Sequence, residues 1–363
     1  MLKSFVINKY ISKDFLKIIL IMIFGFYCLS TIMNLFEEIN FFKDIEIGIF
    51  IPFFMSMLIV PSIIYNLLPF VILLSSIFLF WKLVKTDEVI ALKTSGLSNL
   101  SIIIIPCIVA FFLGIFLVTT INPITSALVE KYENIKGSYN PDKEYLAAIT
   151  SNGIWIKEQN EDITTFIRSS HLEKGHLMDV SIYQLNRNNE PILRMEAVSA
   201  NIKNSTWILK GVRKYEKDEN VSVNTEDTII YKSVYDLNKI ETLYSNLETI
   251  SFWELKKQIK LLADRGYSTK EMRGKLQKAI SFPLFLVAMV LLAAVFTLGK
   301  TYKKNNWSYI FISIFACVLI YFFNDFSIAL GKTEKLPIEL SVWMPVIIVF
   351  IFSFIGLIHV NQK

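Results

Sequence analysis

Long apolar runs and one long polar stretch divide this chain. The apolar runs crowd the first third and the last quarter, and the polar stretch, at about residues 123–278, lies between them. A helix needs about 20 residues to cross the hydrocarbon core of a bilayer while satisfying its own backbone. Five runs meet that length and predict membrane spans at residues 15–36, 100–121, 280–299, 308–330 and 341–360.

The apolar stretch at residues 47–84 is too long for one helix perpendicular to the membrane. It also contains Pro52, Pro61 and Pro69, and proline interrupts helical hydrogen bonding. We therefore expect a helix at the outer membrane interface, followed by a span at residues 62–84. The sequence thus predicts a membrane α-helical bundle with six spans.

The short loops on one side of the predicted bundle are rich in lysine, which marks cytoplasmic loops. The first loop on the other side is acidic, with Glu37 and Glu38 against Lys43. This asymmetry predicts a multi-pass protein with both termini in the cytoplasm and the polar stretch outside it. The cytoplasmic lysines are Lys3, Lys9, Lys13, Lys82, Lys85, Lys93, Lys300, Lys303 and Lys304.

Within the polar stretch, residues 144–236 form short alternating segments rich in Ile, Val, Thr, Tyr and Trp. Such spacing is typical of an antiparallel sandwich or roll. The sequence therefore predicts an inserted all-β domain of β-jellyroll type, whose topology the periodicity leaves open. We expect its apolar contacts to include Trp155, Phe166, Ile182 and Trp207.

Two helix-start signals follow the predicted strands. Ser251 with Glu254, and Ser268 with Glu271, each match a capping box. We interpret the two helices as a stiff connector that leads into the fourth span. The predicted organisation is residues 1–123 for three spans with a short cytoplasmic helix near 86–95, residues 124–250 for the β domain, residues 251–275 for the connector, and residues 276–363 for three more spans.

Composition agrees with a membrane protein, because 53% hydrophobic residues and a mean hydropathy of +0.47 exceed the usual values for soluble domains. The cytoplasmic lysines explain the net charge of +5, and no run of basic and aromatic residues indicates a nucleic-acid partner. Cys28, Cys107 and Cys317 all lie inside predicted spans, so we expect no disulfide in the β domain.

No motif supports catalysis, and we expect neither an enzyme nor a cofactor. The segments at residues 299–301 and 331–333 read Gly-Lys-Thr but lack the earlier glycine of a phosphate-binding loop. His171, Glu173 and His176 lie in one predicted turn without a second set of ligands to complete a metal site. We interpret that turn as solvated and expect no metal.

The stretch between the second and third spans, residues 85–96, predicts a short helix. Asp87 and Glu88 lie in its first turn, where the helix dipole favours anions, and Gly96 ends it. Its apolar residues Val89, Ile90 and Leu92 are too few to form a core. Two interpretations remain open: a simple helical hairpin turn, or a docking helix for a cytoplasmic partner.

Polar residues also occur in the outer halves of two spans. Ser30, Thr31 and Asn34 lie in the first, and Asn324 and Asp325 lie in the fifth. Charged residues inside a membrane are costly and tend to face a cavity or a partner. Reaching the outer interface is the simpler alternative.

In these residues the chain resembles the lipopolysaccharide-export permeases, the LptF/LptG pair, and is closer to LptG. The resemblance runs along nearly the whole chain, and its more specific parts are the turn from Glu88 to Gly96 and the connector that begins at Ser251. The other matching residues are Lys9, Tyr10, Pro69, Asp87, Gly153, Ile154, Trp155, Ser181, Ile182, Tyr183, Lys278 and Pro283.

The resemblance implies a permease subunit of an ATP-driven exporter in the inner membrane of a Gram-negative bacterium. It would extract lipopolysaccharide from the outer leaflet, with an LptF-like second permease and two LptB-like ATPases that use the ATP. An LptC-like single-span jellyroll protein and an LptA-like periplasmic bridge would continue the β domain. The ATPase-coupling residues would be Asp87, Glu88, Val89, Leu92 and Gly96, and a lipid gate between the first and fifth spans would include Thr31, Asn34, Asn324, Asp325 and Phe326.

One departure concerns lipid phosphates. Family members often carry a basic residue near the outer end of the first span, where this chain has Asn34, Glu37 and Glu38. Headgroup recognition would then rest on the other subunit or on Lys43, Arg273 and Lys275. The alternatives to an exporter are a membrane scaffold that recruits periplasmic partners and, less favoured, a membrane-bound enzyme.

Overall fold

The structure is a computed structural model of the chain. It describes residues 2–43, 45, 47–96, 98–139, 145–150, 153–160, 163–173, 175–187, 190–216, 223–233, 235, 247–263, 269–298, 308–333 and 335–361. The chain divides into two compact units. The helical unit comprises Met1–Glu133, Thr249–Lys256 and Lys270–Lys363, and the sheet unit comprises Asn134–Glu248 and Lys257–Thr269.

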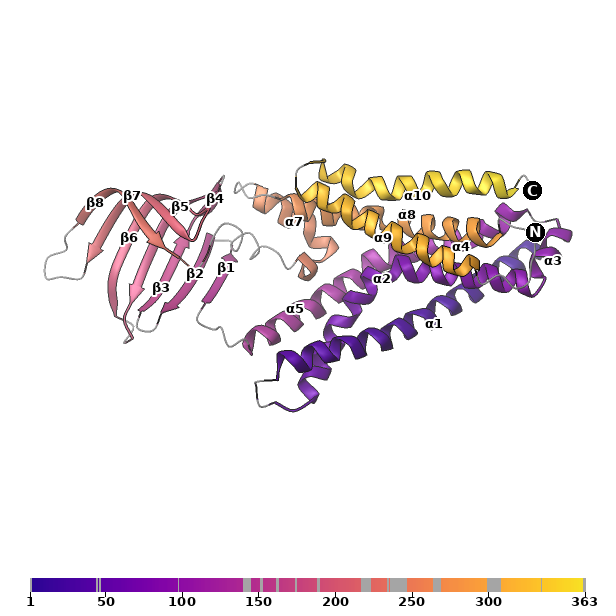
Figure 1. The fold of residues 1–363 in the computed structure, drawn as a ribbon, viewed down its shortest axis with the longest axis horizontal. Helices are drawn as coiled ribbons and strands as arrows, with labels where there is room; N and C mark the ends of the chain where they lie inside the picture. The colour runs from indigo at the N-terminus through magenta and orange to yellow at the C-terminus, as the bar shows by residue number, and fades with distance from the viewer. Residues whose placement is uncertain are drawn as a thin grey trace. The chain divides into compact units, whose positions relative to one another are not determined.

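Six helices of the described residues are long and apolar enough to cross a membrane, which confirms the six predicted spans. Figure 1 shows both ends of the chain at the same end of the helical unit, beside the short helix α3 (Glu88–Thr94). The spans are α1 (Leu2–Phe41), α2 (Phe50–Lys85), α4 (Asn99–Phe116) continued by a π-helical turn (Leu117–Ile121) and α5 (Asn122–Ser138), α8 (Lys270–Leu298), α9 (Ser308–Lys332) and α10 (Ile338–Asn361).

The prediction of a separate interface helix before the second span is wrong. One continuous helix, α2, contains both Pro61 and Pro69. Pro52 lies in its first turn, where a backbone N–H has no helical partner in any case. Each internal proline removes one hydrogen bond, and the neighbouring helices that bury α2 support the remaining backbone. With 36 residues, α2 is about 54 Å long and therefore extends beyond the hydrocarbon core.

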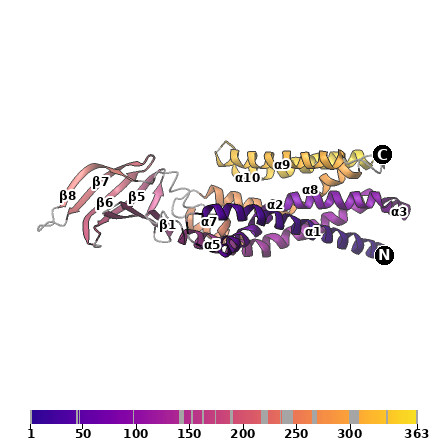
Figure 2. The same ribbon diagram turned by 60° about the horizontal axis from the view of Figure 1, so that its bottom comes forward.

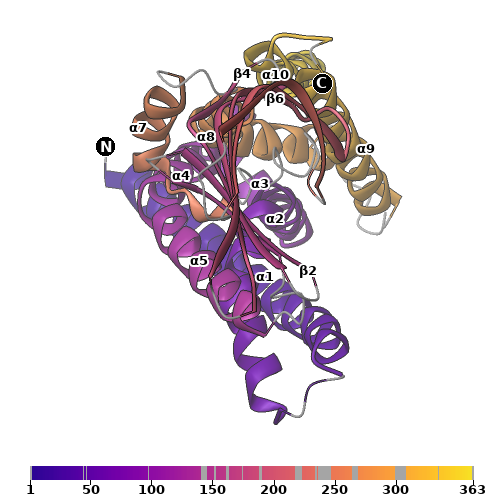
Figure 3. The same cartoon turned by 90° about the vertical axis from the view of Figure 1, so that its left-hand side faces the viewer.

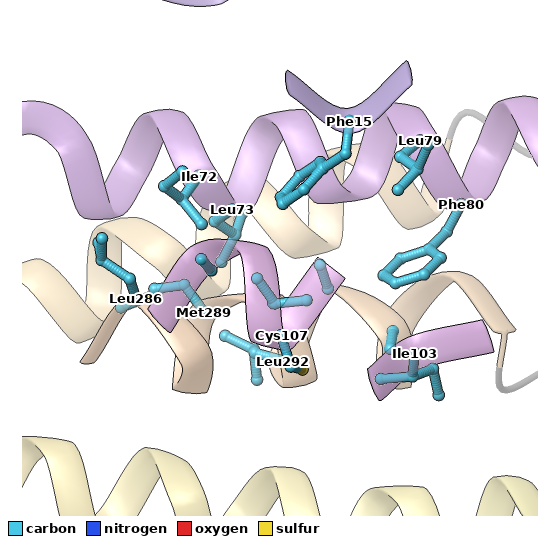
Figure 4. Packing of buried hydrophobic residues seen from close by; sticks show 14 of the residues in the cluster. Phe15, Ile72, Leu73, Leu79, Phe80, Ile103, Cys107, Leu286, Met289 and Leu292 are labelled. Atoms are coloured by element: carbon cyan, nitrogen blue, oxygen red, sulfur yellow. The ribbon is translucent and has the colours of Figure 1, made fainter. Parts of the chain in front are cut away.

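The apolar core of the helical unit forms around α2 and α8, which bury the largest share of their apolar segments. Figure 4 shows Leu73 and Phe80 of α2 close to Met289 of α8 and Cys107 of α4, with Phe15 of α1 reaching the same cluster. α1 and α9 are the least buried spans. Their outer surfaces are apolar and suit contact with lipid or with another subunit.

Close helix packing depends on small residues, as is usual in membranes. At Gly114 on α4, an added Cβ would lie 2.6 Å from the Cα of Pro283 on α8. Only glycine therefore permits this approach. The contact fixes the third span against the fourth, on either side of the inserted sheet unit in the sequence.

The sheet unit contains one antiparallel sheet in which consecutive strands pair as a meander. The order is β1-β2-β3-β5-β6-β7-β8, and the short β4 pairs with β5. Figures 1 and 2 show the strands side by side in this order. The strands are β1 (Tyr145–Thr150), β2 (Gly153–Asn160), β3 (Ile163–Ser169), β4 (His171–Glu173), β5 (His176–Leu185), β6 (Pro191–Asn201), β7 (Thr206–Glu216) and β8 (Val223–Lys232).

One row of positions interrupts the alternation of the sheet. Ser170, Asp179, Val198 and Gly211 make no ladder pair, although the register is the same on both sides of them. Asp179 and Gly211 have positive φ angles of 50° and 62°. At this row the buried positions are three residues apart instead of two. Figure 3 shows that the sheet is strongly curved. The buried positions on either side are Ser169 and Leu172, Leu177 and Val180, Ala197 and Ala200, and Leu209 and Val212.

The inner face of the sheet carries the core of this unit. Trp207 is completely buried, and its indole N–H donates a 2.7 Å hydrogen bond to the carbonyl of Tyr235. Ile182 is also buried, whereas Trp155 is 40% exposed, because it lies on the outer face between Ile154 and Ile156. The expectation that Trp155 belongs to the core is therefore wrong.

A buried carboxylate, Glu158, lies on the same inner face. The hydroxyls of Ser233 and Tyr231 donate hydrogen bonds to it. Burial raises the pKa of Tyr231 above its ordinary value, and the nearby charge of Glu158 raises it further. The neutral phenol is thus the form that the fold prefers.

Candidate functional site

The turn between the second and third spans is an ordered structure. α3 is preceded by Asp87, which has a left-handed backbone with φ 58°, and Gly96 follows with φ 93°. Aspartate and glycine are among the residues that adopt this conformation most readily. Ser98 then begins α4, and its hydroxyl accepts a 3.2 Å hydrogen bond from the N–H of Ser101.

Glu88, the first residue of α3, receives hydrogen bonds from two hydroxyl groups. The Thr86 hydroxyl lies 2.8 Å from Glu88 Oε1, and the Tyr10 hydroxyl lies 3.4 Å from the same oxygen. Tyr10 belongs to α1, so this carboxylate joins α3 to the first span. Neither contact uses Oε2.

A second polar contact, one turn further along α1, joins α1 to α2. Lys82 Nζ on α2 lies 2.9 and 2.8 Å from the two carboxylate oxygens of Asp14 on α1. Tyr10 and Asp14 are four residues apart and share a face of α1. The side chain of Asp14 is only 15% exposed, so water screens this pair less than an ion pair at an open surface.

The predicted coupling residues divide into two groups. Val89 is buried and Leu92 is partly buried against the bundle core, so both anchor α3. Asp87 and Gly96 are exposed and Glu88 is half-buried. Ile90 is 44% exposed and was not among the predicted coupling residues. The three-residue spacing of Val89 and Leu92 places both on one face of α3, and this spacing could have indicated that Ile90 lies on the other face.

The predicted gate residues lie on two helices, α1 and α9, and they differ in how deeply they are buried. In α1, Asn34 is buried and Thr31 is half-buried, with the Thr31 hydroxyl donating to the carbonyl of Tyr27 at 2.8 Å. In α9, Asp325 and Phe326 are exposed and Asn324 is half-buried. Among the described helices, α1 packs mainly on α2, and α9 packs mainly on α10 and α8. The structure therefore does not bring the two groups together within one chain.

The C-terminal end of α1 contains a polar contact that sequence reasoning missed. Glu38 is 1% exposed, and the phenol of Tyr132 on α5 donates a 2.7 Å hydrogen bond to its Oε1. One turn earlier, the side-chain oxygen of Asn34 is buried and has no hydrogen-bond partner within the described part of the chain. The four-residue spacing of Asn34 and Glu38 was the signal for a buried polar face.

The predicted headgroup residues have separate environments. Lys43 and Arg273 are exposed. Lys275 donates a hydrogen bond to the carbonyl of Ile250, immediately before α7 (Phe252–Ala263). Lys275 therefore holds the start of the connector.

The connector helix α7 begins as the sequence predicts, after Ser251. The Ser251 hydroxyl and N–H lie 3.0 and 3.3 Å from Glu254 Oε2. Asn122 accepts a 2.9 Å hydrogen bond from the N–H of Phe252, which fixes α7 to α5. The second predicted capping box depends on Ser268, which lies outside the described residues.

The two Gly-Lys-Thr segments gain no support as nucleotide sites. Residues 299–301 lie outside the described residues. Gly331 and Lys332 lie at the C-terminal end of α9, where the helix dipole disfavours a phosphate, and Lys332 pairs with Glu271 at 3.0 Å. The described residues contain no group of histidine, cysteine and acidic side chains that could hold a metal ion.

Six candidate membrane helices with an antiparallel sheet inserted after the third define a multi-pass membrane protein with a folded domain outside the bundle. The chain belongs to the family of the lipopolysaccharide export system permease LptF/LptG, whose model matches residues 9–359. It is therefore a membrane subunit of a transporter with a role in lipopolysaccharide export, and the family includes both LptF and LptG. No curated protein matches the chain.

Proposed function

We propose that this chain is one of two permease subunits of an ATP-driven exporter in the inner membrane. The exporter extracts lipopolysaccharide from the outer leaflet and passes it to a periplasmic bridge toward the outer membrane. Both termini lie in the cytoplasm in this proposal, because the lysine-rich loops lie on that side. The sheet unit then faces the periplasm.

The observation that carries the proposal is the construction of α3. Val89 and Leu92 anchor the helix in the bundle, while Asp87 and Ile90 remain at the surface. Glu88 Oε2 takes no part in the contacts with Thr86 and Tyr10. An ATPase subunit with a basic groove can therefore bind Glu88 while the carboxylate stays joined to α1.

Two ATPase subunits, one for each permease subunit, supply the free energy in this proposal. Because Tyr10 binds Glu88 of α3 and Asp14 binds Lys82 near the end of α2 that leads into α3, movement of α3 is transmitted to the cytoplasmic end of α1. α1 is one of the two least buried spans.

The proposed lipid gate is formed by α1 and α9. Both carry predicted gate residues, both expose apolar surfaces, and α1 packs mainly on α2 while α9 packs mainly on α10 and α8. We therefore place each gate between α1 of one subunit and α9 of the other. The partner is an LptF-like subunit, with this chain in the LptG position on the resemblance of its Glu88–Gly96 turn and connector.

The sheet unit continues the path outside the membrane in this proposal. β1 and β8 form the two ends of the sheet order, and open strand edges accept further strands by backbone hydrogen bonding. The partners are an LptC-like single-span jellyroll protein and an LptA-like bridge. Lys43 and Arg273, both exposed, are the candidate contacts for the lipid headgroup.

Co-purification tests the function directly. The chain is expressed with an LptF-like permease and an LptB-like ATPase from the same genome, purified through a tag, and analysed by mass spectrometry for bound lipid. The expected result is a complex with both proteins that retains lipopolysaccharide and releases it to a bridge protein only with ATP. A chain that purifies with periplasmic proteins but without an ATPase would instead support a scaffold.

A further inference from the structure

Two adjacent rows on the outer face of the sheet bring basic and aromatic side chains together. The ladder pairing places Arg168 beside Trp155, and it places Arg194 between Tyr183 and Tyr215. Residues two apart on one strand share a face, so both rows lie opposite the buried inner face. The rows are Trp155, Arg168, Ser181, Glu196 and Arg213, and Lys157, Phe166, Tyr183, Arg194 and Tyr215.

The arginines contact the aromatic rings directly. The guanidinium carbon of Arg168 lies 5.5 Å from the ring centre of Trp155. That of Arg194 lies 5.4 Å from Tyr183 and 5.6 Å from Tyr215. These distances are those of cation–π contacts, which restrict the positions of the guanidinium groups and so preorganise them.

The charge of this surface is positive and mostly uncompensated. Glu196 is the one acidic residue of the two rows, and it pairs with Arg194, an interaction that raises the pKa of that arginine. Lys157, Arg168 and Arg213 have no carboxylate partner within the described part of the chain. Arg168 and Arg213 are exposed. Trp155 is 40% exposed and lies in β2, next to the edge strand β1.

We propose that this surface binds the phosphorylated saccharide of the exported lipid. A guanidinium fork matches the two oxygens of a phosphate, and an exposed indole offers a flat apolar face on which the C–H groups of a sugar ring can pack. The five strands span about 19 Å across the ladder, so the surface can contact more than one sugar unit. This inference rests on the proposed function, because the cargo defines the occupant.

Binding of an acyl-free probe tests the surface separately from lipid transport. The full chain is placed in phosphatidylcholine nanodiscs and titrated with deacylated, phosphorylated core oligosaccharide of lipopolysaccharide, with isothermal calorimetry as the readout. The expected result is saturable binding that weakens at least tenfold in Arg168→Ala/Arg213→Ala. The matched control is Lys203→Ala/Lys257→Ala, which removes two exposed positive charges away from the two rows and should change binding by less than twofold.

Two further measurements identify the chemistry that is recognised. Arg168→Lys/Arg213→Lys keeps the charge but loses the fork, and it should bind with intermediate affinity. The same oligosaccharide without its phosphates should bind at least tenfold more weakly to the wild-type chain. Circular dichroism checks that each variant keeps its sheet.

The proposal is overturned if the wild-type chain does not bind the phosphorylated probe, if removal of the phosphates has no effect, or if the arginine variant binds like the control. A surface that instead binds a periplasmic protein in the same nanodiscs, without affinity for the probe, also overturns it. The co-purification experiment tests the exporter itself. A chain that binds the probe but assembles with no ATPase would retain this surface and contradict the proposed function.

Discussion

The hydroxyl of Tyr132 donates a hydrogen bond of 2.7 Å to the buried carboxylate of Glu38, 94 positions away in the sequence. It fixes the C-terminal end of α1 against α5, the last part of the third span before the sheet unit. At the other end of α1, Tyr10 and Asp14 bind Glu88 and Lys82. The first span is therefore held by polar contacts at both ends.

Removal of the Tyr132 hydroxyl should destabilise the helical unit. Tyr132→Phe leaves a buried acceptor without this donor, and we expect a loss of about 1–3 kcal/mol in unfolding free energy. Thermal unfolding of the detergent-solubilised chain measures the effect. Tyr321→Phe is the control, because Tyr321 is 51% exposed; an equal effect of both substitutions would contradict the role of the Glu38 contact.

Glu88 and Tyr10 should have separable effects on the exporter. Glu88→Ala removes the acceptor of both hydroxyls and, in our proposal, the contact with the ATPase, so it should reduce ATPase co-purification. Tyr10→Phe removes only the link to α1, so the ATPase should remain bound while its stimulation by lipopolysaccharide falls. Full export and normal ATPase association in Glu88→Ala would refute the docking assignment.

Two tryptophans of the sheet unit should respond differently to truncation. Trp207 is completely buried, and Trp207→Ala should cost about 3–5 kcal/mol of stability. Trp155→Ala, on the outer face, should cost much less. Hydrogen exchange of the strands in the full chain measures both, and equal loss of protection would show that the burial pattern described above is wrong.

The stability of the sheet unit should fall at high pH through Tyr231. Its pKa is raised in the folded state, so the fold gains stability from the neutral phenol below an unfolded pKa of about 10. As the pH rises above that value, the unfolded chain loses its proton first and this stability is lost. Tyr231→Phe should therefore be less stable near neutrality but less sensitive between about pH 10 and 11, as followed by strand hydrogen exchange.

A cross-subunit gate predicts where lipid can be captured. A photo-crosslinker at Phe326, which is 61% exposed, should capture lipopolysaccharide during transport. The same group at Asn34, which is buried, should capture much less. A disulfide between α1 of one subunit and α9 of the other should stop export with the complex still assembled; crosslinks confined to α2 and α10 would place the path elsewhere.

The sequence predicted the spans because bilayer thickness imposes a minimum length on every apolar run. It failed at α2, since prolines such as Pro61 break an isolated helix but are tolerated where neighbours bury the backbone. Trp155 was misassigned because its large apolar ring suggested burial, whereas the alternation of β2 buries Ile154 and Ile156 and leaves Trp155 on the outer face. The row of Ser170, Asp179, Val198 and Gly211 could not be foreseen either, because it changes the spacing of buried positions in other strands. Strict alternation cannot be followed through such a row.

Contacts between residues far apart in the chain could not be predicted from the sequence. Tyr10 with Glu88, and Tyr132 with Glu38, require the positions of two helices at once. The basic and aromatic rows likewise cannot be recognised in the sequence, because their members come from five different strands and no short segment contains them. The identity of α3 as a helix was predictable from its terminal signals, whereas the burial of Val89 depended on the neighbouring core.

The unpaired row in the sheet also restricts how the chain can change in length. Ser199 pairs with Lys210 on one side of it, and Ala197 pairs with Val212 on the other, so β6 and β7 cross the row with the same number of residues. Deletion of Gly211 alone would shift one half of β7 by a residue and turn Trp207 and Leu209 outward. Insertions and deletions in this domain must therefore accumulate in its hairpin turns, while the interiors of the strands keep a constant length.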